Sequence, residues 1–129
     1  MLPEWPDRTV MVLSTGAGPP HAITVSTAIR SGPATVHFAL GLRRESLARL
    51  REDPRCALAV LAGGIAITAY GTASVVKESD RVAFLRLEVD SVKDHDQPTF
   101  ELEDGVRWRW TDDDAEAGDA EVRAALREL

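Results

Sequence analysis

The chain has 129 residues, 44% of them hydrophobic and 28% charged, with a formal net charge of −6 at pH 7. This length suits one domain with a sizeable core, so we expect a single domain over residues 1–129. The acidic balance argues against nucleic-acid binding, which needs a basic surface. No apolar run approaches the ~20 residues that span a bilayer, and no basic-then-apolar leader opens the chain. We therefore expect no membrane segment and a cytoplasmic location.

Turn residues divide the first third of the chain into three predicted strands. The first covers Arg8–Thr15 and ends at a Gly-Pro turn, and the second covers Ala22–Ile29 and pairs with the first as a hairpin. Ser31-Gly32-Pro33 predicts another turn, and Ala34–Leu40 predicts the third strand.

A short amphipathic helix is predicted after the third strand. It begins near Arg44, places Leu47 and Leu50 on one face and stops at Asp53-Pro54, because proline cannot continue a helix. The next predicted strand covers Arg55–Leu61.

Two longer strands are predicted in the middle of the chain. The glycine pair Gly63-Gly64 predicts a hairpin turn before a strand over Ile65–Val76, in which Gly71 marks a bulge or a close backbone approach. The pattern over Val82–Val92 admits a strand or the start of a helix, and its β-branched residues favour the strand.

The C-terminal part predicts one more strand and a helix. Apolar and charged residues alternate over Val106–Thr111, and Glu116–Leu129 has the periodicity of a terminal helix. Many strands and few helices favour a mainly β fold, a small antiparallel barrel with a short inserted helix and a C-terminal helix.

The single cysteine and the three histidines offer little chemistry of their own. Cys56 has no partner for a disulfide within the chain, and its apolar neighbours predict a buried, inert thiol. His95 lies between two aspartates in a polar loop, which more often marks solvation than a metal ligand, so we expect no metal site. His21 follows Pro20 at a strand start, and we expect it to be exposed or to satisfy a turn. We expect His37 to lie on the surface because its parity is opposite to that of its apolar neighbours.

Charge is unevenly distributed along the chain. Residues 1–60 hold seven Lys/Arg and five Asp/Glu, whereas residues 61–129 hold eight and sixteen. The acidic residues gather in Asp94–Asp104 and Asp112–Glu121, which we predict to be solvated segments.

Arg43 and Arg44 stand where the predicted helix begins. A helix N-terminus carries a positive partial charge, so two cations are disfavoured there unless an anion joins them. Free N–H groups together with two guanidinium groups suit a phosphate. The alternative is that both arginines are solvated turn residues.

Five short segments, together with the order of elements from about Arg8 to Thr111, point to a known family. The segments are Gly18-Pro19-Pro20-His21, the L-x-x-D-P-R of Leu50–Arg55, Tyr70-Gly71-Thr72-Ala73, Ser91–His95 and Gly105–Trp110. In these features the chain resembles the flavin-binding split barrels, the pyridoxamine-phosphate-oxidase-like proteins that include flavin and deazaflavin oxidoreductases.

The resemblance implies a six- or seven-stranded antiparallel split β-barrel of Greek-key type. It also implies a homodimer in which each cofactor lies in a groove between the subunits. Trp108 and Trp110 are then predicted to be core or dimer-interface residues, with stacking on a flavin as the alternative.

By the same resemblance, the cofactor ring lies against the second strand, and the cofactor phosphate lies where the third strand ends and the helix begins. The family commonly carries Arg-Lys where this chain has Glu45-Ser46, which is a departure from the pattern. The implied cofactor contacts are Thr24, Val25 and Ser26 for the ring, and Leu40, Arg43, Arg44, Ser46 and Leu47 around the phosphate.

We expect an FMN-binding oxidoreductase that transfers hydride to or from a small organic substrate. No general acid and base stand out, which is consistent with a cofactor that carries the chemistry. One alternative is a reductase that uses the deazaflavin F-420, whose polyglutamate tail would suit Arg49, Arg51 or Arg55. Another is a cofactor-binding or storage module without catalysis, which Glu45-Ser46 favours.

Overall fold

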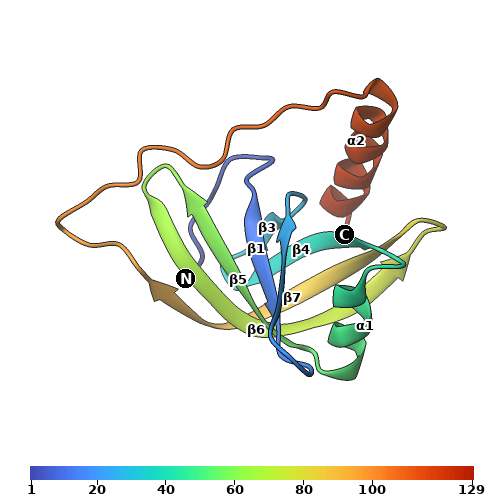
Figure 1. The fold of residues 1–129 in the computed structure, drawn as a ribbon, viewed down its shortest axis with the longest axis horizontal. Coiled ribbons are helices and arrows are strands. Elements are labelled where there is room, and N and C mark those ends of the chain that lie inside the picture. The colour runs from blue at the N-terminus through green and yellow to red at the C-terminus, as the bar shows by residue number, and fades with distance from the viewer.

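The computed structural model describes residues 1–129 as seven strands in one sheet with two helices (Figure 1). The strands are β1 (Met11–Thr15), β2 (His21–Val25), β3 (Ile29–Gly32), β4 (Thr35–Gly41), β5 (Arg55–Ala62), β6 (Ile65–Glu78) and β7 (Val82–Asp94), and the helices are α1 (Glu45–Glu52) and α2 (Asp113–Arg127).

The strand order in the sheet is β2-β1-β5-β6-β7-β4-β3, and every neighbouring pair is antiparallel. β2 and β3 therefore lie at opposite edges of the sheet, although only residues 26–28 separate them in the chain. So short a connection requires the sheet to curl until its edges approach each other, as Figure 1 shows. The result is an open barrel, which confirms the predicted split-barrel fold.

The core fills the inside of this curled sheet. Inward-facing residues alternate with outward-facing ones along each strand, because successive side chains of a strand point to opposite faces. Leu47 and Leu50 of α1 join the same core, as the amphipathic pattern predicts. Each such buried leucine contributes about 1.5–3 kcal/mol relative to an exposed one. α1 thus closes one end of the barrel.

Two residues singled out in the sequence behave as predicted. The strand register shifts between Tyr70 and Gly71, where a Cβ on Gly71 would lie 2.0 Å from the carbonyl oxygen of Glu88. Glycine is thus required by a close approach of two backbones. Cys56 is 7% exposed, and this burial raises the pKa of its thiol to about 12, so the thiol is inert at neutral pH.

The predicted strand over Val106–Thr111 is wrong. Residues 95–112 form no strand, and none of residues 106–111 makes a backbone–backbone hydrogen bond. The segment is held by isolated contacts instead, such as Gly64 N–H to Leu102 O (2.8 Å) and the Trp108 indole N–H to Arg8 O (2.9 Å). Its tryptophans are half-buried and its arginines exposed, so side chains alternate here without a paired backbone.

Two boundaries also differ from the prediction. The second predicted strand is divided, since β2 ends at Val25 and Ile29 already belongs to β3, so the turn falls after Gly32 rather than at Ser31-Gly32-Pro33. The terminal helix begins three residues early, because the Asp112 carboxylate accepts a hydrogen bond from Ala115 N–H (2.9 Å) and caps it. Much of the second acidic segment is therefore helical.

α2 lies on the outside of the barrel against β3 and β4. Its two buried residues are Arg123 and Leu126. The Arg123 guanidinium donates to the Asp119 carboxylate (2.7 Å) on the same helix and to Ser26 O (2.6 Å). Neither α1 nor α2 combines the length and the hydrophobicity that a membrane span requires.

Candidate functional site

Three arginines without carboxylate partners lie near the end of β4 along the backbone. Arg43 and Arg44 are exposed and immediately precede α1, and the carbonyl of Arg81 accepts a hydrogen bond from Leu42 N–H (3.1 Å). None of the three forms an ion pair. The N-cap Arg44 also provides no side-chain cap for the first N–H groups of α1. Arg43 and Arg44 therefore stand at the uncapped start of α1, where the sequence predicted them, and the fold adds Arg81.

Glu45, His21 and Ser46 form a hydrogen-bonded chain at the start of α1. The His21 Nδ1 lies 3.0 Å from the Glu45 carboxylate, and its Nε2 lies 2.9 Å from the Ser46 hydroxyl. In the neutral ring, Nδ1–H donates to the carboxylate, so Nε2 accepts from the hydroxyl. His21 therefore ties β2 to α1, and the prediction that it is exposed or satisfies a turn is wrong.

The hydrogen-bonded residues Glu45, His21 and Ser46 have the order of an acid–base–nucleophile array. The burial of Ser46 excludes a nucleophilic role for its hydroxyl in this conformation. Ser46 is 1% exposed, so no acyl group can reach its hydroxyl. The hydroxyl already has a partner inside the protein.

The other predicted contacts fall into two groups. Val25, Leu40 and Leu47 are buried in the core, so their side chains face away from solvent. Thr24 is exposed on the outer face of β2, and Ser26 is half-buried with its carbonyl bound by α2. The structure brings β2, the end of β4 and α1 together, and it leaves the cofactor role of these residues a prediction.

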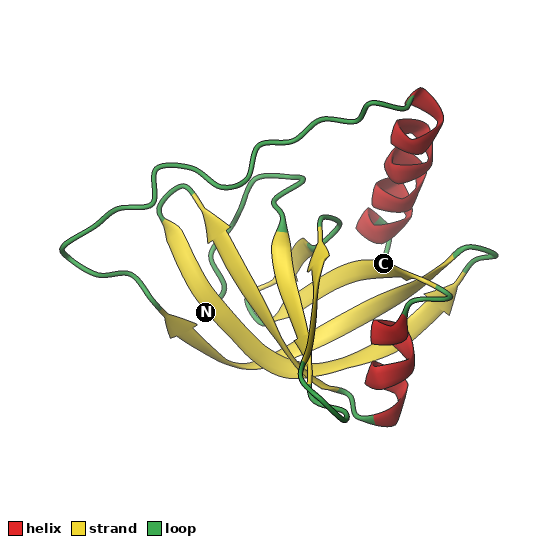
Figure 2. Cartoon of the chain, in the orientation of Figure 1, coloured by secondary structure: helices red, strands yellow, loops and turns green.

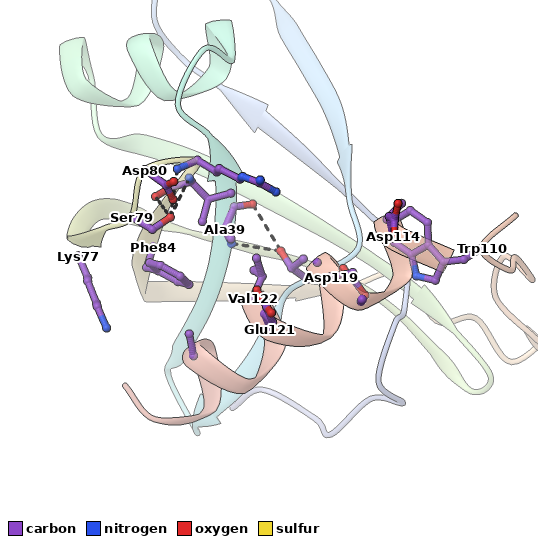
Figure 3. Close-up of a pocket in the computed structure, with 17 residues that line it drawn as sticks. Ala39, Lys77, Ser79, Asp80, Phe84, Trp110, Asp114, Asp119, Glu121 and Val122 are labelled. Atoms are coloured by element: carbon purple, nitrogen blue, oxygen red, sulfur yellow. Dashed lines mark hydrogen bonds between the residues drawn. The ribbon is translucent and has the colours of Figure 1, made fainter. Parts of the chain in front are cut away.

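An open groove of about 840 Å³ runs beside α2, and sequence reasoning missed it (Figure 3). Its floor is formed by Ala39, Val82 and Phe84, whose side chains lie on the outer face of β4 and β7. Thr27 lines it as well, and the Thr27 hydroxyl accepts from Ala39 N–H (3.1 Å). No local pattern predicts this groove, because its wall is a helix far away in sequence.

The two sides of the groove carry different charge. The β6–β7 hairpin contributes Lys77 and Arg81 together with Asp80, whereas α2 contributes only acidic groups. The acidic residues from α2 that line the groove are Asp114, Asp119 and Glu121.

His37 is buried, so its predicted surface position is wrong. It is 4% exposed, its Nδ1 is bonded to the Ser31 hydroxyl, and its Nε2 accepts from Arg86 Nε (3.3 Å). Burial, together with the Arg86 charge, lowers the pKa of His37. The parity argument placed the side chain on the correct face, but α2 packs on that face of β3 and β4.

The arginines suited to an acidic cofactor tail are all engaged within the chain. Arg49 donates to the carbonyls of Ala17 and Pro19, and thereby fixes the β1–β2 loop. Arg51 pairs with Glu78. Arg55 pairs with Asp53 (2.8 Å), and this hydrogen-bonded pair lowers the pKa of the aspartate to about 2. No group of three or more His, Cys, Asp or Glu side chains is placed to hold a metal ion.

An open antiparallel barrel with a helix between β4 and β5 defines the class of the protein, a split barrel. No protein-family model and no curated protein matches the chain. Solved structures do match. The flavin reductase component of a bacterial two-component tryptophan halogenase has a TM-score of 0.61 at 13% identity, over 70% of this chain and 81% of that one.

Two further structures give the same result. An NADH:FAD oxidoreductase from Streptomyces globisporus has a TM-score of 0.59 at 14% identity, over 79% of this chain and 86% of that one. A pyridoxamine 5'-phosphate oxidase-like protein from Listeria innocua has a TM-score of 0.57 at 15% identity, over 67% and 88%. The chain thus has the fold of the pyridoxamine 5'-phosphate oxidase-like split barrels.

Proposed function

We propose that the chain binds FMN and serves as an oxidoreductase for a small organic substrate. The observation that carries the proposal is the set of three unpaired arginines, Arg43, Arg44 and Arg81, at the junction of β4, α1 and the β6–β7 hairpin, next to an open groove. The similarity of the fold to flavin reductases supports the same conclusion.

The residues present fit an FMN-sized ligand. A volume of about 840 Å³ falls within the range of roughly 300–1,000 Å³ for ligand pockets. Planar guanidinium groups form paired hydrogen bonds with a phosphate. When bound, FMN would supply the hydride chemistry, and the chain would bind and orient it.

FMN is favoured over the deazaflavin by the state of the other arginines. Arg49 holds two loop carbonyls, and Arg51 and Arg55 are paired with acids. A polyglutamate tail would have to displace these contacts, whereas a single phosphate can use the unpaired cations. A cofactor-binding module without catalysis is the second candidate, and it is favoured by Ser46, whose hydroxyl is enclosed where the family commonly has a cation.

We also propose that the protein is a homodimer that pairs through the outer face of β2, β1, β5 and β6. Two copies that each have a net charge of −6 repel one another. They therefore associate best through a surface without charge. β7, in contrast, points Arg86, Glu88 and Asp90 outward. The outward residues in the middle of the other four strands are uncharged and include Val12, Ser14, Ala22, Thr24, Ala57, Ala59, Thr68 and Tyr70, whereas the charged Arg55 and Lys77 lie where β5 begins and β6 ends.

Light scattering tests the dimer. Tyr70 is 44% exposed, so Tyr70→Glu should fold and yet separate the copies, whereas Asp90→Lys on the charged face should leave the mass unchanged. A parent protein that has the monomer mass of 14.0 kDa contradicts the proposal.

Titration with flavins tests the function. FMN, riboflavin, FAD and the deazaflavin are each titrated into the parent protein and into the double variant Arg43→Ala with Arg44→Ala. A charged hydrogen bond is worth roughly 1.5–3 kcal/mol, so the variant should bind FMN at least about tenfold more weakly. Riboflavin lacks the phosphate, so its affinity should not change.

The double variant Lys93→Ala with Arg107→Ala is the matched control, because it removes the same charge from exposed, unpaired positions. Equal FMN affinity in the parent and the Arg43/Arg44 variant would place the phosphate elsewhere. A parent protein that binds no flavin would refute the oxidoreductase and the FMN module together.

A further inference from the structure

The groove beside α2 has chemically distinct ends. Figure 3 shows Lys77, Ser79 and Asp80 of the β6–β7 hairpin at one end, and Trp110 and Asp114 at the other. The apolar floor lies between the two ends. The groove thus offers cations at one end and an aromatic ring at the other.

Trp110 is held in place by a stack of neighbouring groups. Its ring meets the ring of Trp108 edge-on, with the centroids 5.2 Å apart and an interplanar angle of 80°. Trp108 in turn donates its indole N–H to Arg8 O (2.9 Å), and the Arg8 guanidinium lies 4.2 Å from the centre of its ring. Trp110 is itself half-buried and lines the groove, so it is positioned by the protein without being enclosed in the core.

Charge sets the direction in which a flavin would lie. Asp114 lies at the same end of the groove as Trp110, so an anionic group is repelled from that end. Lys77 and Arg81 line the hairpin end, and Arg81 is one of the three unpaired arginines. Asp80 is also at the hairpin end, and the two cations outnumber it.

We propose that Trp110 stacks on the ring system of the flavin, with the flavin phosphate at the Arg81 end of the groove. This proposal rests on the proposed binding of FMN and adds a ring contact that the fold alone does not assign. The ring contact implied at Thr24–Ser26 adjoins it, because the chain continues from Ser26 to Thr27, which lines the groove. α2 is then one wall of the cofactor site.

Fluorescence and affinity test the role of Trp110. An indole stacked on a flavin quenches the flavin fluorescence, so bound FMN should be strongly quenched in the parent protein and brighter in Trp110→Ala. Trp110→Ala removes one aromatic contact with the flavin, so its Kd for FMN should rise about threefold to tenfold. Trp110→Phe should keep most of the affinity and lose part of the quenching.

Trp5→Phe is the matched control, because Trp5 is also half-buried but donates to Ala28 O and does not line the groove. It should change neither the Kd nor the quenching. If the parent protein binds FMN and Trp110→Ala has the same affinity and the same quenching, this inference is overturned. The proposed function is then still supported. If the parent protein binds no flavin, the proposed function fails and this inference fails with it.

Discussion

α1 and α2 cover the barrel in different ways, which Figure 2 shows in red against the yellow sheet. α1 has eight residues, of which Ser46, Leu47 and Leu50 are buried, and it reaches its neighbours through short loops. α2 has fifteen residues, of which only Arg123 and Leu126 are buried, and it follows an eighteen-residue segment without a strand or helix. The longer helix is therefore the less firmly attached one.

The difference separates a helix that is part of the core from one that borders an open groove. Leu47 and Leu50 belong to the main core cluster, so α1 cannot leave without exposing the inside of the barrel. Leu126 is equally buried but lies outside that cluster. Elements with few core contacts open locally at low free-energy cost. An open groove beside α2 is consistent with that type of attachment.

Matched leucine truncations should separate the two helices. Leu47 and Leu126 are each 1% exposed. Leu47→Ala should lower the global free energy of unfolding by about 3 kcal/mol, within the range for buried leucines. Leu126→Ala should lower the hydrogen-exchange protection of α2 and change global unfolding much less. Denaturant titration and native-state hydrogen exchange measure both effects.

Leu42→Ala serves as the control for the local chain, since Leu42 is only half-buried beside α1. Its effect on unfolding should be smaller than that of Leu47→Ala. If Leu126→Ala lowers global stability as much as Leu47→Ala does, then α2 unfolds together with the barrel and the comparison fails.

The sequence predicted what depends on local periodicity. The alternation in β1, β4 and β5 and the stop of α1 at Asp53-Pro54 are local signals. These four elements lie close to where they were expected, although β1 begins three residues later. Val106–Thr111 shows the limit of this reasoning. Its side chains alternate as in a strand, but a strand also needs a neighbouring backbone to pair with, which no local pattern reveals.

The candidate site was predictable only in part, for the same reason. Arg43 and Arg44 could be identified, because their position before a helix is a local feature. Arg81 could not, because only the pairing of β4 with β7 brings it to Leu42. His37 was assigned to the correct face of β4, yet its burial depends on α2, more than seventy residues further along the chain.

The pH dependence of stability should report on the surface beneath α2. The lowered pKa of His37 keeps its ring neutral in the folded state, whereas an unfolded histidine titrates near 6.5. Below about pH 6.5 the unfolded state binds a proton that the folded state does not. The free energy of unfolding should therefore fall as pH drops through this range, and become level below the folded pKa of His37.

Unfolding titrations between pH 5 and 8 measure this effect in the parent protein and in His37→Gln. Arg86 opposes the protonation of His37 and Glu88 favours it, so neither of these two residues is changed in the comparison. The two proteins differ only at residue 37, so the difference between the two profiles isolates His37. Identical profiles in the two proteins would contradict the prediction.

The smallest expected effect is a gain in the stability of α2 alone. Gly118 lies inside α2, and a Cβ added there meets no atom within 4 Å. Glycine inside a helix costs roughly 0.5–1 kcal/mol relative to alanine, so Gly118→Ala should raise the local opening free energy of α2 by about that amount. We expect α2 to open independently of the barrel, so hydrogen exchange should detect the change while the denaturant midpoint stays nearly constant. Ala120→Gly, at an exposed position of the same helix, should have the opposite effect. A shift of the global midpoint by the full amount in Gly118→Ala would show that α2 is as firmly built into the barrel as α1.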